Sequence, residues 1–229
     1  AILCRLLSLA TPQAWDAGHF QTALMWFCIL AMTVGNLSAL AQKDLKRLLG
    51  YSTIAHAGYI LLALQTFSQA GFTAAIFYAL GYFIMSFACF LVISEIGKKE
   101  DLVTIESVSG LYKRAPLMAF TLLLGLFGLI GLPPTVGFVG KWFLFSAALE
   151  RGQFYLVLVA AINATIGLYY YLMVIRQVYW VEPTTTEIFK PSPLIAVTAL
   201  ATIILVIAMG TFPGTFWAFA EKAASALLS

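Results

Sequence analysis

Charged side chains are scarce in this sequence. Asp, Glu, Lys and Arg make up 10% of its 229 residues, against about 25% in an ordinary soluble domain, and 62% of the residues are hydrophobic. This composition excludes a water-soluble fold. The net charge is only +3, with no basic block that could neutralise a row of phosphates, so we expect no nucleic-acid partner.

Cysteine is also rare, and its placement argues against metal or disulfide chemistry. Cys4, Cys28 and Cys89 each lie inside an apolar stretch, without C-x-x-C spacing or a nearby pair of histidines. We therefore interpret them as small buried hydrophobic side chains. The sequence also has no nucleotide-binding loop and no nucleophile triad. These absences predict a chain that itself binds neither a metal nor a cofactor.

Long uncharged runs are abundant, and a membrane helix needs about 20 such residues. The runs cover residues 17–42, 48–94, 115–140, 152–175 and 191–220. The second run is long enough for two helices, so the sequence predicts an all-α, polytopic transmembrane helix bundle with six spans. These spans are expected at about 21–41, 49–66, 71–96, 116–149, 153–178 and 193–212.

The first nine residues, AILCRLLSL, predict the end of a further helix before these spans. Because the sequence opens inside an apolar stretch, with no initiator Met and no cleavage site, we expect a fragment of a longer protein. We predict three parts. Residues 1–9 are the tail of a preceding transmembrane helix, 21–180 form a five-helix unit with a broken helix at 116–149, and 193–229 are a final span and its tail.

The cations are distributed unequally between alternate loops. One set of loops holds nine cations, the opposite set holds three, and Lys141 lies inside a span. The nine are Lys43, Lys46, Arg47, Lys98, Lys99, Lys113, Arg114, Arg176 and Lys190; the three are Arg5, Arg151 and Lys222. Since Lys and Arg accumulate on the cytoplasmic side of membrane helices, the nine-cation side is predicted to face the cytoplasm or its equivalent.

Two adjacent prolines, Pro133 and Pro134, lie in the middle of the predicted span 116–149. They remove two helical N–H donors and clash with the carbonyls of the preceding turn, so the span must break there. Glycines flank them on both sides, at Gly128, Gly131, Gly137 and Gly140. We predict two half-helices joined by an extended link, which must be buried by protein or line a wet cavity. The alternative is a simple proline kink.

Lys141 follows this break in an otherwise uncharged stretch, three residues after the predicted restart of the helix near Phe138. A lysine at a span centre costs about 3 kcal/mol and usually marks an ion or proton path. Desolvation and the positive end of the helix dipole both disfavour the ammonium form, which suits a group that loads and releases a proton. The alternative is a lysine that reaches the interface, since Arg151 is ten residues away.

His56 is the second predicted proton-carrying residue. It lies ten residues beyond Lys46, which places it roughly 15 Å into its helix. A neutral imidazole accepts a proton at one nitrogen and donates from the other, and Ser52 and Tyr59 share its helix face. A histidine that only makes a hydrogen bond between helices is an equally weighted alternative.

Three segments together resemble a known family. They are LSALAQKDLKRLLGYSTIAHAGYILLAL, GLPPTVGFVGKWFLFSAAL and IGLYYYLMVIRQVY, at residues 37–64, 131–149 and 166–179. The chain resembles the C-terminal half of the antiporter-like membrane subunits of proton-pumping NADH:quinone oxidoreductase, respiratory complex I. Within that family it is similar to the N type, because the related M type carries Glu at the position of Lys141.

The resemblance implies a particular architecture. The family has fourteen transmembrane helices built from two inverted five-helix repeats, each with one discontinuous helix. This chain would begin at the tail of helix 8, contain the second repeat as helices 9 to 13 and end with helix 14. By the same resemblance, Lys141 matches the lysine of the broken helix 12, and His56 matches a polar position on helix 10. The family's residues on helices 5, 7 and 8 would precede Ala1.

The resemblance also implies a function. We expect a proton-translocating subunit that couples quinone reduction to pumping, in a translocase whose NADH, FMN, iron–sulfur clusters and quinone are bound by other subunits. Its partners would be the lipid bilayer and the M-type, small K-type and J-type membrane subunits. The expected location is a bacterial plasma membrane, or otherwise a mitochondrial inner or thylakoid membrane.

Two other functions remain open from the sequence. One is a subunit of a multisubunit sodium/proton antiporter or an ion-pumping hydrogenase, both of which resemble this family. The other is a structural subunit that moves no ion, in which case Lys141 would be permanently paired in a dry pocket.

Overall fold

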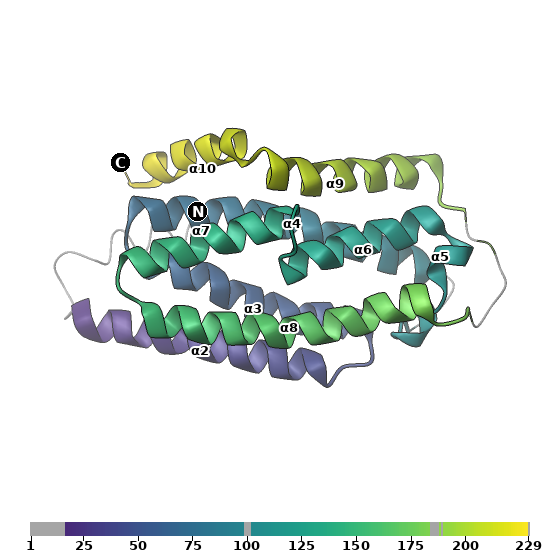
Figure 1. The fold of residues 1–229 in the computed structure, drawn as a ribbon, viewed down its shortest axis with the longest axis horizontal. Coiled ribbons are helices and arrows are strands. Elements are labelled where there is room, and N and C mark those ends of the chain that lie inside the picture. Colours follow the sequence, from purple (N-terminus) through teal and green to yellow (C-terminus); the bar gives the residue numbers. More distant parts are fainter. Residues whose placement is uncertain (1–16, 99–101, 184–187, 189, 229) are drawn as a thin grey trace.

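The computed structural model describes residues 17–98, 102–183, 188 and 190–228. In this part of the chain all regular structure is helical, apart from an isolated bridge between Asp44 and Thr104 (Figure 1). The long helices are α2 (Ala17–Leu40), α3 (Leu45–Leu64), α4 (Gln69–Ile96), α6 (Pro116–Ile130), α7 (Val136–Glu150), α8 (Phe154–Trp180), α9 (Pro193–Thr211) and α10 (Pro213–Leu228). The predicted all-α bundle with a discontinuous helix is confirmed. The helix tail predicted at residues 1–9 lies outside the described residues.

Two short helices close one end of the bundle. They are a 3-10 helix, η1 (Glu106–Val108), and α5 (Leu111–Arg114). The backbone of this segment is tied to two long helices. The N–H of Ile105 donates to Lys43 before α3, and the N–H of Gly110 donates to Gln177 of α8, at 2.9 and 3.1 Å. The loop between α4 and α6 is therefore part of the folded body.

Local sequence explains where several helices begin. The Asp44 carboxylate accepts the N–H of Arg47 at 2.8 Å and caps α3, and the Ser68 hydroxyl accepts the N–H of Gly71 at 3.0 Å and caps α4. Both satisfy N–H groups that have no partner inside the helix. Helices α6 and α9 begin with Pro116 and Pro193, whose missing N–H costs nothing in a first turn.

Four described helices are long and apolar enough to cross a membrane by length and composition. These segments are Phe20–Leu40, Gln69–Ile96, Phe154–Trp180 and Pro193–Thr211. The prediction of six spans differs from this count for two reasons. The 20-residue α3 carries polar and charged side chains that lower its hydropathy, and α6 and α7 have only 15 residues each, or about 22 Å apiece at 1.5 Å per residue.

Helix α4 is the centre of the bundle. It contacts α3, α6, α7, α9 and α10, and its buried residues run from one end to the other. Large side chains on the outer faces of the bundle are apolar, for example Trp26, Phe83 and Ile204, at 56%, 67% and 63% exposure. A central helix surrounded by other helices, together with an apolar outer surface, is the arrangement expected for a helix bundle in lipid.

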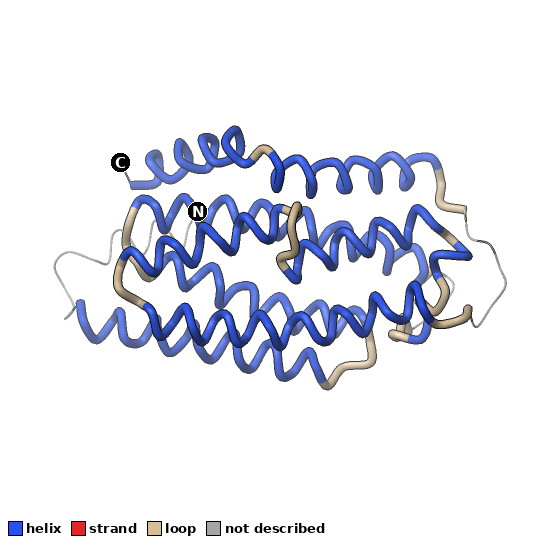
Figure 2. The backbone as a smooth tube through the Cα atoms, in the orientation of Figure 1, coloured by secondary structure: helices blue, strands red, loops and turns tan. Residues whose placement is uncertain are grey.

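The segment after residue 212, predicted as a tail, is helical. It forms α10, which continues the line of α9 after a one-residue interruption at Phe212 (Figures 1 and 2). Helix α10 packs on α4, and its Ala220 and Ala224 are fully buried. The grouping of residues 21–180 into one repeat stays a prediction.

Candidate functional site

The site is built around the break between α6 and α7 (Figure 2). Helix α6 ends at Ile130, and Gly131 follows in the left-handed region, with a φ of 89° that favours glycine. The N–H groups of Gly131 and Leu132 both donate to the carbonyl of Phe127, at 2.9 and 3.0 Å, a common helix ending. The hydroxyl of Thr135 donates to the carbonyl of Leu132 at 2.7 Å. The doubled proline therefore lies in a short link with a defined backbone, and the span is interrupted as predicted.

The two half-helices touch through their backbones. A Cβ atom on Gly137, at the start of α7, would overlap the carbonyl oxygen of Gly128 near the end of α6. Only glycine fits such an approach. The four residues predicted to form the break, Gly131, Pro133, Pro134 and Gly137, thus lie between or at the ends of the two half-helices.

Lys141 bridges the break. Its side chain is buried, with 8% of the residue exposed, and Nζ donates to the carbonyl oxygens of Leu129 and Ile130 at 2.9 and 2.8 Å. These carbonyls belong to the last turn of α6, where the helix itself supplies no N–H partners. The amine of α7 therefore completes the hydrogen bonding of the C-terminus of α6.

This geometry corrects part of the sequence argument. Helix α7 begins at Val136, two residues before the predicted restart at Phe138, so Lys141 lies in the second turn and not the first. Its amine faces the end of α6, where the partial negative charge of a helix C-terminus favours an ammonium. Sequence reasoning considered only the positive end of α7, because it could not place the amine against a second helix end. The amine points into the break and not toward Arg151.

Tyr59 of α3 lies beside both predicted proton-carrying residues. Nζ of Lys141 is 5.4 Å from the centroid of the Tyr59 ring, and the His56 ring is 5.7 Å from it, edge-on. The face of an aromatic ring attracts a cation. Lys141 and His56 both therefore lie beside the Tyr59 ring in one region of the core, with no hydrogen bond between them among the described contacts.

Both ring nitrogens of His56 face tyrosine hydroxyls. Nδ1 is 2.7 Å from Tyr78 of α4, and Nε2 is 3.2 Å from Tyr171 of α8. The Tyr171 hydroxyl is also 2.6 Å from the hydroxyl of Ser52. In a neutral imidazole one nitrogen donates and the other accepts, so both contacts can be hydrogen bonds at once. The structure thus contains the hydrogen bonds between helices that the alternative interpretation requires, and the role of His56 in proton transfer stays a prediction.

A second buried polar cluster joins α2 to α8. Asn36 donates through its side-chain amide to the backbone and side-chain oxygens of Asn163, at 3.1 and 3.3 Å, and accepts the Tyr170 hydroxyl at 2.9 Å. The rings of Tyr170 and Tyr171 are 4.4 Å apart, so this cluster adjoins the one around His56. Of the three consecutive tyrosines at 169–171, Tyr170 and Tyr171 are buried and Tyr169 is exposed.

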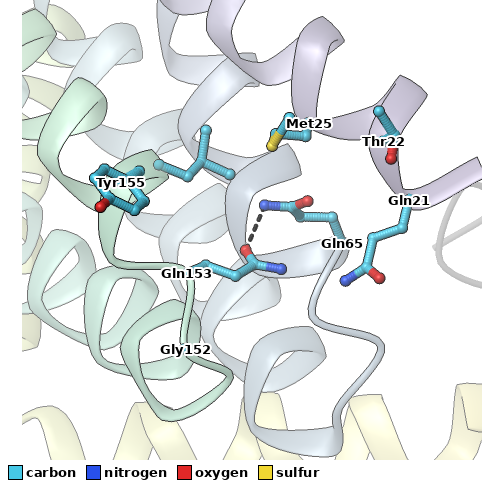
Figure 3. A pocket seen from close by; sticks show the side chains of 8 residues that line it. Gln21, Thr22, Met25, Gln65, Gly152, Gln153 and Tyr155 are labelled. Carbon is cyan, nitrogen blue, oxygen red and sulfur yellow. Dashed lines mark hydrogen bonds between the residues drawn. The ribbon is translucent and has the colours of Figure 1, made fainter. Parts of the chain in front are cut away.

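A cavity of about 360 Å³ lies at the end of the bundle opposite most of the cations. Figure 3 shows the side chains that line it. Three amide side chains line it, from Gln21 of α2, Gln65 at the end of α3 and Gln153 before α8. Gln65 is 1% exposed and donates to Gln153 at 2.5 Å, while its own Oε1 has no partner among the described residues. Buried polar groups without a protein partner are usually bound by water, so the cavity is suited to hold water.

Metal chemistry has no support in the described part of the chain. It contains no group of three or more His, Cys, Asp or Glu side chains that could hold a metal ion. Cys28 and Cys89 are buried free thiols, as predicted, and Cys4 lies outside the described residues.

These features define a polytopic helical membrane protein whose ionisable site is built on a broken helix, an architecture that secondary ion transporters also use. Over residues 1–167 the chain matches the family described as NADH:quinone oxidoreductase/Mrp antiporter, TM. Since this match covers most of its length, the chain belongs to that family.

Known relatives agree with the assignment. The chain is 46% identical over 218 residues to NADH-quinone oxidoreductase subunit N 2 of Syntrophobacter fumaroxidans, a match that covers 94% of this chain and 46% of the relative. Among solved structures, it is similar to a chain of respiratory complex I from Thermus thermophilus, with 37% identity, a TM-score of 0.78 and coverage of 86% of this chain and 45% of that one.

The fold also occurs in a different respiratory complex. A chain of the membrane-bound sulfane sulfur reductase, an archaeal respiratory membrane complex, matches with 29% identity and a TM-score of 0.89, covering 100% of this chain and 46% of that one. The chain thus spans about half the length of the relatives it matches.

Proposed function

We propose that this chain is part of a proton-translocating membrane subunit of an NADH:quinone oxidoreductase, and that Lys141 carries the proton. One observation supports this most strongly: a buried amine hydrogen-bonds across a helix break in the core of a membrane bundle. Ionisable groups inside membrane bundles are rare and usually mark an ion or proton path. The similarity to subunit N of Syntrophobacter fumaroxidans supports the choice of complex.

The surroundings of Lys141 suit a group that changes charge. An ammonium has three N–H groups and a neutral amine has two, and the carbonyls of Leu129 and Ile130 need two. Both protonation states can therefore keep these hydrogen bonds. Burial disfavours the charged form, while the C-terminus of α6 and the Tyr59 ring favour it, so a modest external charge can tip the balance.

The proton reaches or leaves Lys141 by way of the hydroxyl groups around His56. Tyr78, Tyr171 and Ser52 form a continuous set of exchangeable protons with His56, and the Tyr59 ring lies beside both His56 and the amine. Water is needed to complete the step between His56 and the amine. Release occurs on the face opposite the nine cations, where the amide-lined cavity at Gln65 opens between α2, α3 and α8.

The remaining components are assigned to other subunits. This chain contributes no redox centre; NADH, FMN, the iron–sulfur clusters and quinone bind elsewhere in the complex. The outer apolar faces contact lipid and neighbouring membrane subunits of the M, K and J types. The bacterial plasma membrane is the proposed location, since the similar subunit N of Syntrophobacter fumaroxidans is bacterial.

The test is Lys141→Gln in the intact complex, reconstituted into vesicles. Glutamine can still donate hydrogen bonds to α6 but does not titrate, so electron transfer from NADH to quinone should continue while proton uptake or release falls. Lys222→Gln, on the exposed surface of α10, is the matched control and should leave pumping unchanged. Normal pumping in Lys141→Gln would leave the structural-subunit alternative.

A second candidate is a subunit of an Mrp-type sodium/proton antiporter. The description of the family includes the Mrp antiporter, and a buried amine at a broken helix fits that chemistry equally well. Transport that requires sodium, together with purification free of redox subunits, would favour it. Sodium-independent proton pumping driven by NADH oxidation would favour the oxidoreductase.

A further inference from the structure

A second helix discontinuity lies against the first. Helices α9 and α10 are separated only by Phe212, and the backbone just before this joint packs on the α6–α7 link (Figures 1 and 2). A Cβ atom on Gly210 would overlap the carbonyl oxygen of Pro134 and would lie 2.8 Å from the carbonyl carbon of that residue. The end of α9 therefore fixes the position of the link from one side.

Helix α10 contacts α7 just after Lys141 in the sequence. The Trp217 ring lies 4.3 Å from the ring of Phe143, which follows Lys141 by two residues. Both rings also contact Phe77 of α4, with centroid distances of 6.2 and 5.3 Å. The α9–α10 pair thus contacts the chain immediately before α7 through Gly210 and α7 itself through Trp217.

An uninterrupted helix, α4, also packs on the break. Helix α4 packs on the start of α7 through Gly81, where a Cβ would lie 2.5 Å from the Val136 side chain, and on the end of α6 through Met85, whose side chain fills the space beside Gly128. Glycine contacts of this kind leave little room for movement. The break is therefore contacted both by the continuous α4 and by the interrupted α9–α10 pair, which also pack on each other.

Lys141 depends on these contacts. Its amine is on α7 and its two acceptors are on α6, so both hydrogen bonds survive only while the half-helices keep their relative position. A shift of about 1 Å would lengthen them beyond hydrogen-bond distance. The described hydrogen bonds and ring contact of the amine come from α6 and α3, not from α9 or α10, so the effect of these two helices is one of positioning.

We propose that the joint between α9 and α10 positions Lys141 by clamping the link and the start of α7, with Gly210 and Trp217 as the positioning residues. This inference rests on the proposed function of Lys141 as the proton carrier. It assigns to the C-terminal helices, which lie outside the predicted five-helix unit, a part in proton transfer.

The experiment compares Gly210→Ala with Gly214→Ala in the intact complex. The two glycines flank the joint, but a Cβ on Gly214 meets nothing within 4 Å. Two readouts are needed: a high-resolution map around Lys141, and the pH profile of proton pumping measured against quinone reduction. We expect Gly210→Ala to separate the Lys141 amine from the carbonyls of Leu129 and Ile130 and to shift the pH profile. Gly214→Ala should change neither.

If the Gly210→Ala complex fails to assemble, Trp217→Ala provides a second test. Trp217→Ala should give the same displacement and shift, and Trp217→Phe, which keeps a ring against Phe143, should restore both. Unchanged Lys141 hydrogen bonds in Gly210→Ala and Trp217→Ala, or displaced bonds with an unchanged pH profile, would overturn the positioning role. Normal pumping in Lys141→Gln would instead remove the proposed function, and the map would still show whether the clamp holds the amine.

Discussion

Lys141 combines two tasks in one side chain. It supplies the hydrogen-bond donors that the C-terminus of α6 lacks, and it places a titratable group in the core of the bundle. The first task holds the break together, and the second is the proposed carrier function. The two can be separated experimentally, because donors and charge are lost independently in different substitutions.

A stability comparison isolates the hydrogen-bonding task. Lys141→Met and Lys141→Gln both remove the charge, but only Met removes the donors, leaving two buried carbonyls without partners. We expect the Met variant to be less stable than the Gln variant by about 1–3 kcal/mol, the cost of an unsatisfied buried polar group. Denaturation in detergent measures the difference. Equal stability of the two variants would mean that the amine does not cap α6.

A tyrosine comparison tests the polar cluster around His56. Tyr171→Phe removes the hydroxyl that contacts both Ser52 and His56, so proton pumping per quinone reduced should fall. Tyr169→Phe is the matched control, since its side chain is 61% exposed and points out of the bundle. Equal pumping in both variants would exclude Tyr171 from the proton path.

The sequence could indicate Lys141 and His56 because each is a polar residue inside an apolar run. It could not identify their partners. Tyr78, Tyr170 and Tyr171 resemble ordinary apolar span residues until helices distant in sequence are packed together. Asn36 and Asn163 are also polar residues inside predicted spans, but the sequence does not show that they form hydrogen bonds with each other.

At the scale of helices, the position of the break was predictable from the sequence. The helix end that faces the Lys141 amine, and therefore the sign of its partial charge there, was not. Two missing N–H donors interrupt a helix whatever surrounds it, so Pro133 and Pro134 located the link. The direction of the helix-end field at Lys141 depends instead on how α6 and α7 face each other. Helix α10 was missed because charged and small residues make its hydropathy low, and its helix is stabilised by packing on α4.

A glycine comparison tests the contact between the half-helices. Gly137→Ala places a methyl group on the Gly128 carbonyl and should destabilise the protein by about 1–3 kcal/mol or more, as overpacking does. Gly50→Ala in α3 meets nothing within 4 Å and should be neutral or stabilising by up to about 1 kcal/mol. Thermal unfolding of the two purified variants measures both. A Gly137→Ala variant as stable as Gly50→Ala would contradict the close approach.

For the whole molecule, the charge asymmetry agrees with the arrangement of the helices. In the described residues the ends of α2, α4 and α8 and the starts of α3, α6 and α9 lie together, and the loops at that end carry most of the cations (Figure 1). Lys99 and Arg5, which were counted in the prediction, lie outside the described residues. The amide-lined cavity is at the other end.

Thiol labelling tests the orientation. We expect a membrane-impermeant maleimide to label Arg151→Cys from the outside of intact cells and Lys190→Cys only in inverted vesicles, with the unsubstituted chain as background. Both positions are exposed. The reverse pattern would show that the nine-cation end faces outward and would move the proposed release side.

The central claim is that Lys141 gains and loses a proton during turnover, and vibrational difference spectroscopy of the intact complex tests it most directly. The complex would carry isotope-labelled lysine, and spectra would be compared before and during quinone reduction. We expect a lysine ammonium band that changes on turnover in the unsubstituted protein and is missing in Lys141→Gln. Identical difference spectra for the two proteins would contradict it.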